Sequence, residues 1–363
     1  MAVINKLSIH QFRNLTTQFI SPCAGINLFI SDNAQGKTNL IEAIYYLGHN
    51  RSFKTKILKE IINFEADSFQ LGAEVDKNKI KLEKSKTITK ISINQQKVGN
   101  SSKLSQLLPI QIITPDKGFV VNGIPKNKRS YLDWGVFHVK PKAAKTFKTY
   151  NKTLKNINIL LAKKQADELD FWFLELAKSA AIINKNRVEY LQQLKKTMFS
   201  EKIKNLDKLI DSTDKFDYKF SSGWPKEVDK LDEQSIYQHL KTHKQHLLHT
   251  KYLNYGSHKA NIFFTFGNRS ECFFSRGEQK TLSIIFWLTQ VVMLVDLGIK
   301  PIILIDDLSS ELDDDKVNTI LQHLQLLNVQ TFMTDISHNL AIEQINPATA
   351  IFKINQGEIT QQK

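Results

Sequence analysis

The pattern of hydrophobic and polar residues divides the chain into three stretches, which differ in the spacing at which apolar residues recur. The first stretch contains short, strand-like runs and one run with helical spacing, Thr38–Leu47. The expected strands are Val3–Ile9, Ile26–Ile30, Phe69–Val75, Ile80–Leu82, Ile88–Ile93 and Ile110–Ile113. The runs between residues 69 and 93 are separated by short polar turns, so we expect them to form a small antiparallel sheet.

The second and third stretches have a different character. From Asn127 to about Lys251 apolar residues recur at helical spacing on a lysine-rich background, which predicts several helices and few strands. An apolar helix is then expected over Thr281–Leu297, followed by strands over Pro301–Ile305 and Val329–Met333. The order is therefore β-rich, then helical, then α/β.

Composition and charge exclude some classes of protein. The chain has 363 residues, of which 41% are apolar, and its formal charge is +14. The two cysteines, Cys23 and Cys272, exclude a disulfide framework and a four-cysteine zinc site, so we expect a reducing, cytoplasmic location. The apolar run Leu282–Leu297 is shorter than a membrane span requires, and we expect no membrane association. The excess of lysine is compatible with an anionic partner without identifying it.

A candidate phosphate-binding loop follows the second expected strand. It consists of Ser31, Asp32, Asn33, Ala34, Gln35, Gly36, Lys37 and Thr38. A strand before such a loop and a helix after it are the context in which backbone N–H groups bind phosphate. Lys37 would contact the β- and γ-phosphates, and the Thr38 hydroxyl would bind Mg²⁺. Serine occupies the first position, where the usual pattern has glycine. The alternative interpretation is a structural turn.

Two acidic residues follow the expected strand near residue 305. Asp306 and Asp307 come directly after four apolar residues, as at the end of a buried parallel strand. Asp306 would hold Mg²⁺, and Asp307 would orient or deprotonate an attacking water. ATPases with this layout of motifs usually have glutamate at the second position, and the shorter aspartate would suit slow turnover. A solvated acidic turn is the alternative for this strand taken alone.

A third motif precedes the long apolar helix. It consists of Ser275, Arg276, Gly277 and Glu278, and it would offer a hydroxyl, a flexible backbone and a helix N-terminus to a phosphate group. The order resembles the signature loop of ABC-type ATPases. Residues 309–313 resemble their D-loop. An ordinary helix cap is the alternative for Ser275.

Together these motifs resemble the RecF family, short-armed relatives of the SMC-type and ABC-type ATPases. The resemblance covers nearly the whole chain. It also includes Phe12-Arg13-Asn14, Asn50–Thr55, Gly123–Asp133 and Gly256–Lys259. It implies an α/β fold: an ABC-type P-loop ATPase head, split in sequence, with an N-terminal antiparallel β subdomain and an inserted compact α-helical arm. The expected domains are 1–115 and 256–363 for the two halves of the head and 116–255 for the arm.

The resemblance also implies a function. A RecF-type protein would bind ATP and Mg²⁺, form a homodimer in which each signature loop reaches the partner's nucleotide, and bind duplex and gapped DNA. Hydrolysis would be slow, weak and stimulated by DNA. With RecR-type and RecO-type mediators the protein would load recombinase in recombinational repair, replication restart and SOS induction. The alternatives are an ABC transporter subunit and a nuclease-coupled ABC-type ATPase, for which no additional metal motif is found.

Basic residues gather at the start of the expected arm. Nine lysines and arginines and one acid, Asp133, lie between residues 126 and 160, and Lys128 is one of the nine. Helical spacing places Lys145, Lys148, Lys152 and Lys155 on one face. We expect Lys145, Lys148 and Lys152 to bind the phosphate backbone of DNA. A solvated face is the alternative. Nearby aromatic residues either stack on bases or pack in a core, namely Tyr131, Trp134, Phe137, Phe147 and Tyr150.

Overall fold

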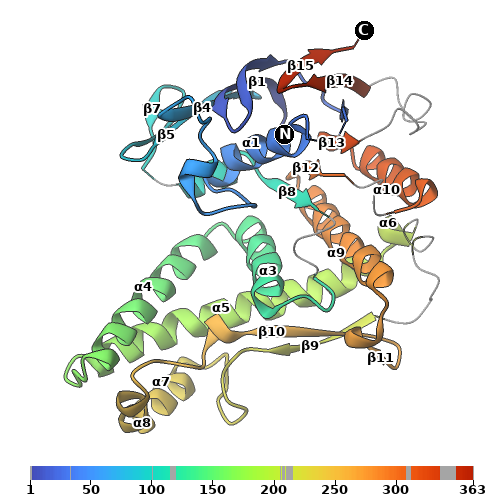
Figure 1. Ribbon diagram of the computed structural model, residues 1–363. Coiled ribbons are helices and arrows are strands. Elements are labelled where there is room, and N and C mark those ends of the chain that lie inside the picture. Colours follow the sequence, from blue (N-terminus) through green and yellow to red (C-terminus); the bar gives the residue numbers. More distant parts are fainter. Residues whose placement is uncertain are drawn as a thin grey trace. The chain divides into compact units, whose positions relative to one another are not determined.

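The computed structural model describes residues 2–32, 34–99, 101–114, 120–204, 206, 209, 216–307, 312–335 and 349–362 (Figure 1). Contacts divide the chain into two compact units. Unit 1 consists of Met1–Lys117, Glu201–Asp211 and Trp287–Lys363, and unit 2 of Gly118–Ser200 and Ser212–Phe286. Unit 1 is thus built from both ends of the chain. The boundaries expected at 115/116 and 255/256 stay a prediction; by contacts, residues 256–286 belong to unit 2.

The first sheet of unit 1 has six strands in the order β15-β14-β3-β13-β12-β8. Its strands are β3 (Ile26–Ile30), β8 (Ile110–Ile113), β12 (Ile302–Ile305), β13 (Thr331–Asp335), β14 (Thr349–Asn355) and β15 (Glu358–Gln361). All pairs are parallel except β14 with the edge strand β15. Strands β3, β12 and β13 are buried along their whole length. Strand β12 is a continuous apolar run, as expected for a parallel strand covered on both faces, whereas β3 contains Asn27 and β13 ends in Asp335. Their carboxyl ends meet at one edge of the sheet.

The second sheet of unit 1 is antiparallel, with the order β2-β1-β4-β5-β6-β7. Its strands are β1 (Ile4–Phe12), β2 (Leu15–Ile20), β4 (Ser68–Val75), β5 (Asn78–Ser85), β6 (Thr89–Ile93) and β7 (Gln96–Lys97). Buried residues alternate with more exposed ones along β4, as expected for a sheet with one face on a core. The predicted antiparallel sheet between residues 69 and 93 is confirmed.

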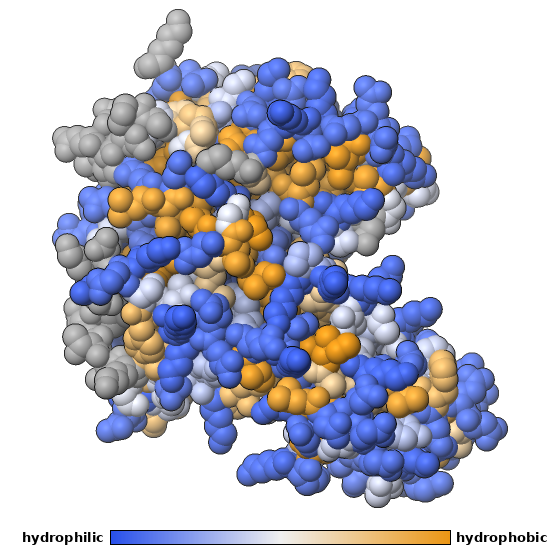
Figure 2. Space-filling model, turned by 180° about the vertical axis from the view of Figure 1, so that it is seen from behind, coloured by the Kyte–Doolittle hydropathy of each residue, from blue (hydrophilic) through white to orange (hydrophobic). Residues whose placement is uncertain are grey.

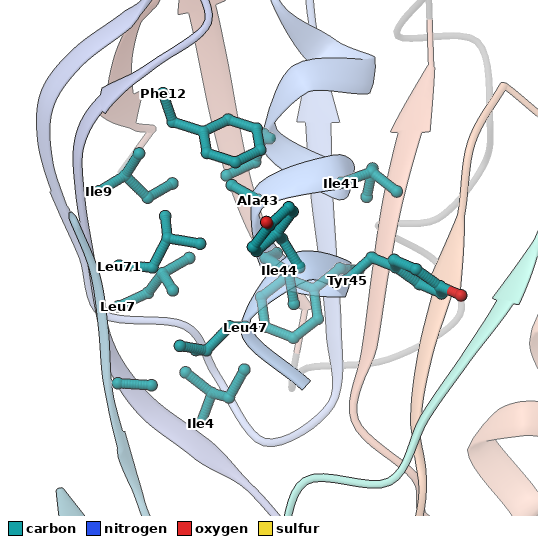
Figure 3. Close-up of a cluster of buried hydrophobic side chains, with 14 of the residues drawn as sticks. Ile4, Leu7, Ile9, Phe12, Ile41, Ala43, Ile44, Tyr45, Leu47 and Leu71 are labelled. Atoms are coloured by element: carbon teal, nitrogen blue, oxygen red, sulfur yellow. The ribbon is translucent and has the colours of Figure 1, made fainter. Parts of the chain in front are cut away.

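Helix α1 (Lys37–His49) lies between the two sheets and forms the core of unit 1. Ten of its thirteen residues are buried, because it packs on both sheets rather than on one. In Figure 3 side chains from β1 and β4 point toward one side of this helix, among them Ile9, Phe12 and Leu71. Phe12, Tyr46 and Phe69 pack edge to face, with ring centroids 5.1–5.9 Å apart.

Unit 1 also contains other helices. Three of them are short, namely η1 (Leu58–Glu60), α2 (Ser101–Leu107) and α6 (Glu201–Lys204), and α10 (Asp314–Leu326) is as long as α1. Helix α10 begins where the Asp313 side chain accepts a hydrogen bond from the Lys316 N–H. Helix α9 (Arg276–Asp296) contributes its first part to unit 2 and the rest, from Trp287, to unit 1. It begins five residues before the expected start at Thr281.

Unit 2 is mainly helical. Its helices are α3 (Pro125–Val139), α4 (Ala143–Ala162), α5 (Leu169–Met198), α7 (Glu233–Thr242), α8 (Lys244–Thr250) and η3 (Ser257–Lys259). Helices α4, α5 and α7 pack around a core that includes Ile157, Phe173 and Leu240. Arg187 on α5 forms a two-pronged ion pair with Asp133 on α3, at 2.8 and 2.9 Å. The several helices expected in this stretch are confirmed.

Unit 2 also has a three-stranded antiparallel sheet with the order β11-β10-β9. Its strands are β9 (Phe216–Ser221), β10 (Asn261–Phe266) and β11 (Arg269–Ser270), and η4 (Glu271–Phe273) follows. Strand β9 was not predicted, although its sequence alternates between apolar and polar residues. Phe216 pairs with Phe266, 50 residues further along the chain, so no local pattern revealed the pairing.

The α/β fold class predicted from the sequence is confirmed by these sheets and helices. Hydrophilic residues cover most of the face drawn in Figure 2, and hydrophobic residues are visible between them in patches. Across the ranges that the structure describes, no helix is both long enough and apolar enough to cross a membrane.

Candidate functional site

The phosphate loop, residues 31–38, connects strand β3 to helix α1, as the sequence predicts. Its backbone is left-handed at Ala34 (φ 65°) and at Gly36 (φ 114°). A Cβ atom at Gly36 would lie 3.0 Å from the side chain of Asn14, so this position requires glycine for both its backbone and its space. The φ angle of Ser31 is not positive, and serine in place of glycine there adds no backbone strain.

Lys37 is folded back over the loop. Its side chain is buried, and its Nζ donates hydrogen bonds to the carbonyl oxygens of Ser31 and Asp32, the latter at 3.0 Å. Burial lowers the pKa of Lys37, and four carboxylates counteract this shift, those of Asp307, Asp335, Asp32 and Asp306. The structure therefore brings the lysine of the loop close to both acids at the end of β12.

Asp306 is surrounded by polar groups from three different segments. The Thr334 hydroxyl donates a hydrogen bond to its Oδ1 atom at 2.9 Å. Burial raises the pKa of Asp306, while hydrogen bonds from Thr334 and Thr38 and the positive charge of Lys54 act in the opposite direction. Thr38 and Asp306, the two predicted Mg²⁺ ligands, thus lie close enough to interact.

Asp307 follows in a left-handed conformation, with φ 55°. Its N–H donates to the Thr334 hydroxyl at 3.0 Å, so one hydroxyl group bonds both acids. Left-handed backbone is uncommon outside glycine, and aspartate tolerates it better than most residues. Thr334 was not predicted as a site residue. The available signal was its position at the end of β13, since polar residues that end neighbouring parallel strands lie at the same edge.

A fully buried carboxylate, Glu42, connects helix α1 to two other motifs. Arg13 binds it through both Nε and Nη2, the latter at 2.8 Å from Oε1, and the Ser52 hydroxyl donates to the same carboxylate. Ser52 Oγ in turn accepts hydrogen bonds from the N–H groups of Lys54 and Thr55 at 2.8 and 3.0 Å. The Phe12–Asn14 turn and the Arg51–Thr55 loop are therefore fixed to the helix that starts at the phosphate loop.

The predicted signature loop lies in unit 2, at the start of helix α9. The Ser275 N–H donates to Glu278 Oε2 at 2.7 Å, and the Glu278 N–H donates to Ser275 Oγ at 3.3 Å. This reciprocal pair is a capping box. These contacts and nearby Arg269 lower the pKa of Glu278. Ser275, Arg276 and Gly277 are exposed, and none of the residues that the structure describes comes within 4 Å of a Cβ placed at Gly277.

Four exposed lysines line the solvent face of helix α4. We call Lys145, Lys148, Lys152 and Lys155 the α4 lysine stripe. The opposite face packs into the core through Tyr150, Ile157 and Leu161, among others. None of the four lysines has an ion-pair partner in the part of the chain that the structure describes. The stripe is therefore four uncompensated charges on one face.

Other members of the basic segment have structural roles instead. Lys128 is buried, donates to Glu271 and to the Ile262 carbonyl oxygen at 2.7 Å, and so does not belong to an exposed basic face. Lys140 is paired with Glu189. Tyr131 and Tyr150 are also buried, so for these two the core interpretation is confirmed and base stacking is wrong. The sequence could not reveal the Lys128 pairing, because Glu271 is 143 positions away.

Some predicted residues lie outside those that the structure describes. They are Asn33 of the phosphate loop and residues 309–311 of the predicted D-loop.

Comparison with known proteins identifies similar chains over the full length. Residues 3–360 match the family model described as RecF/RecN/SMC N terminal domain. The "DNA replication and repair protein RecF" of Pseudoalteromonas translucida (strain TAC 125) is 31% identical over 369 residues, covering 98% of this chain and 99% of the relative. That of Haemophilus influenzae (strain 86-028NP) is 32% identical over 371 residues, covering 98% of each.

Solved structures agree with this similarity. A structure of the recombination mediator protein RecF with ATP, in the RecFOR pathway, matches with a TM-score of 0.86 and 27% identity over 100% of this chain and 98% of that one. The Smc head domain of Pyrococcus furiosus matches with a TM-score of 0.57 at 13% identity, covering 100% and 97% of the two chains. The latter likeness concerns the fold alone.

Proposed function

Because this chain belongs to the RecF family, within the RecF/RecN/SMC group, we propose that it is an ATP-dependent DNA-binding protein of recombinational repair. One observation carries the proposal. Lys37, Thr38, Asp306 and Asp307 come from segments about 270 positions apart, yet their side chains interact at one edge of the parallel sheet. A related structure contains ATP, which supports ATP as the nucleotide.

In the proposed site each residue has one role. The N–H groups at the start of helix α1 and the Lys37 ammonium would bind the phosphates, once Lys37 exchanges its bonds to the loop carbonyl oxygens for phosphate oxygens. Thr38 and Asp306 would hold Mg²⁺. One hydroxyl and one carboxylate suit this ion, which binds few protein ligands and completes its shell with water and phosphate. When bound, Mg²⁺ would neutralise charge on the phosphates.

Asp307 is the residue that we propose to act on water. Its backbone is fixed by the Thr334 hydroxyl, which also fixes Asp306, so the two carboxylates keep a constant relation to each other. Aspartate is one methylene shorter than the usual glutamate. We therefore propose slow hydrolysis, suited to a nucleotide-controlled binding protein with weak, DNA-stimulated ATPase activity.

DNA would bind to the α4 lysine stripe. Its charges are exposed and uncompensated, and such charges attract the phosphate backbone with little dependence on base sequence. Duplex and gapped DNA are the proposed substrates, and binding to DNA would place the protein in the cytoplasm.

ATP would also control assembly. Ser275 carries its hydroxyl group at an exposed helix N-terminus, as a residue that reaches the γ-phosphate of a second subunit would need. We propose an ATP-induced homodimer that acts with RecR-type and RecO-type mediators. Its role would be to load recombinase in repair, replication restart and SOS induction. The related protein solved with ATP is a recombination mediator of the RecFOR pathway, which supports such partners.

The decisive experiment combines nucleotide and DNA binding. Isothermal calorimetry should detect ATP binding in the wild type and none in Lys37→Ala, which lacks the cation directed at the phosphates. Labelled gapped DNA should then bind the wild type more tightly with Mg·ATP than without it, and Lys37→Ala should not show this difference. Wild-type ATP affinity in Lys37→Ala would overturn the proposed site.

A further inference from the structure

The phosphate loop contains strained backbone that something must hold in place. Ala34 has φ 65° and Gly36 has φ 114°. For alanine the left-handed region is disfavoured, and such conformations persist only where surrounding structure enforces them. The neighbouring contacts of the loop therefore matter for its shape before any nucleotide is bound.

The C-terminal β-hairpin supplies two of these contacts. Between β14 and β15 the chain turns through Gln356 and Gly357, with φ values of 46° and 84°, as in a type I′ turn. The Gln356 N–H donates to the side-chain Oε1 of Gln35 at 2.7 Å. The Gly357 N–H donates to the main-chain oxygen of Gln35 at 3.1 Å. Both N–H groups of the turn thus end on a single residue of the phosphate loop.

The Phe12–Asn14 turn supplies the others. Asn14 Nδ2 donates to the Gln35 main-chain oxygen at 3.4 Å, and Asn14 Oδ1 accepts from Asn39 Nδ2 of helix α1 at 2.8 Å. The two turns also touch each other, because a Cβ at Gly357 would lie only 2.4 Å from the Asn14 carbonyl oxygen. Gln35 therefore lies between two turns that come from opposite ends of the chain.

We propose that Gln35 is a positioning residue and that the C-terminal hairpin turn sets the nucleotide affinity of the phosphate loop through it. We call Asn14, Gln35, Gln356 and Gly357 the loop clamp. The clamp holds the loop in its left-handed shape, so binding does not have to order it, and less of the binding energy is lost. Linkage requires the reverse effect as well: nucleotide in the loop stabilises the hairpin turn. This inference rests on the proposed function, in that ATP is the ligand.

The test uses two glycines that differ in one respect. Gly357 and Gly298 both have positive φ, 84° and 76°, so alanine is strained at each. At Gly298 no atom of the described residues lies within 4 Å of the added Cβ, whereas at Gly357 the Asn14 carbonyl oxygen must move. Calorimetry should show ATP binding at least tenfold weaker in Gly357→Ala than in Gly298→Ala, measured at a temperature at which both variants are fully folded.

A second variant leaves the hairpin unchanged. Gln35→Met keeps the length of the side chain and the main-chain oxygen but removes the Oε1 acceptor for the Gln356 N–H. Its ATP affinity should fall severalfold. Combined with Gly357→Ala, the two losses should be less than additive, because both act through one clamp. Gln35→Met also tests the loop clamp by itself if Gly357→Ala does not fold.

Amide hydrogen exchange distinguishes loss of the loop clamp from a general loss of protein stability. In the wild type, ATP should slow exchange at Gln356 and Gly357, and in Gln35→Met this protection at Gln356 should be lost. Equal ATP affinity in Gly357→Ala and Gly298→Ala, or unprotected hairpin amides in ATP-bound wild type, would overturn the clamp while leaving the proposed function intact. Absence of ATP binding in the wild type would overturn both.

Discussion

Replacing Thr334 by valine removes one hydroxyl group and almost nothing else, yet that hydroxyl bonds both acids of the candidate site. It donates to Asp306 Oδ1 at 2.9 Å and accepts from the Asp307 N–H at 3.0 Å. Thr334 is fully buried, so water cannot replace the lost partner without a rearrangement. Thr334→Val therefore tests whether these contacts organise the site or only stabilise the fold.

The stability cost can be worked from the two bonds. A hydrogen bond to a charged group contributes about 1.5–3 kcal/mol and a neutral one about 0.5–1.5 kcal/mol. The free energy of unfolding should therefore fall by about 2–4 kcal/mol, measured by urea denaturation. Loss of the bond should also raise the pKa of Asp306 further, because the Thr334 hydroxyl now counteracts the effect of burial.

The functional effect should appear in turnover more than in binding. Lys37 and Thr38 are unchanged, so ATP affinity should change less than threefold, while kcat should fall at least tenfold because Asp307 loses its backbone anchor. The acid limb of the pH–rate profile should move to higher pH with the pKa of Asp306. Thr334→Ser, which keeps the hydroxyl, should restore kcat.

A matched control lies on the same strand. Thr331 is equally buried, but its hydroxyl makes only a 3.4 Å bond to the Val329 carbonyl oxygen. Thr331→Val should leave kcat unchanged. Wild-type turnover in Thr334→Val, or an equal loss in Thr331→Val, would refute the positioning role of Thr334.

The remaining predictions concern DNA, assembly and pH. Replacing three lysines of the α4 lysine stripe with alanine should weaken DNA binding for all sequences and reduce the slope of log affinity against log salt by about one per lost phosphate contact; an unchanged slope would make the stripe an ordinary solvated face. In sedimentation with ATP, Asp307→Asn should accumulate as an ATP-bound dimer, whereas Ser275→Arg should bind ATP but stay monomeric. If Ser275→Arg dimerises like the wild type, Ser275 does not contact the nucleotide of a second subunit. Burial lowers the pKa of His323 from 6.5 to about 4. As the pH falls below 6.5, the unfolded chain therefore gains this proton before the folded chain does, and at pH 5 the free energy of unfolding is about 2 kcal/mol lower than at neutral pH. His323→Met should lack this acid loss, and the exposed control His246→Met should keep it; equal loss in both would contradict the assignment.

The elements that could be predicted from the sequence are those whose cause is local. Strand β12 is buried on both faces, so its four apolar residues and the acids that follow identify it without knowledge of its neighbours. Helix α1 was predicted as Thr38–Leu47 and extends over Lys37–His49, because its apolar spacing and the loop before it lie in one segment. Both depend on patterns of fewer than about 15 residues.

The contacts that could not be predicted join distant segments. Glu42 is the one acid of helix α1, and only the fold shows that Arg13 neutralises its charge and that Ser52 donates a hydrogen bond to it. Lys128 belongs by sequence to a basic segment, but its charge is used inside unit 2 with Glu271. A charge pattern indicates how many cations a segment has, and burial decides which of them remain for a partner.

The charges around the phosphate loop suggest why metal and nucleotide would bind together. Within the described residues the groups that act on Lys37 are four carboxylates, and the cation that acts on Asp306 is Lys54. Two cations against four carboxylates leave a formal charge of −2, which opposes the entry of a polyphosphate. One Mg²⁺ ion at Thr38 and Asp306 would cancel that charge. The same acids that repel free ATP would then favour the metal complex, so we propose that the site would select Mg·ATP by electrostatics before any contact with the base or sugar is made.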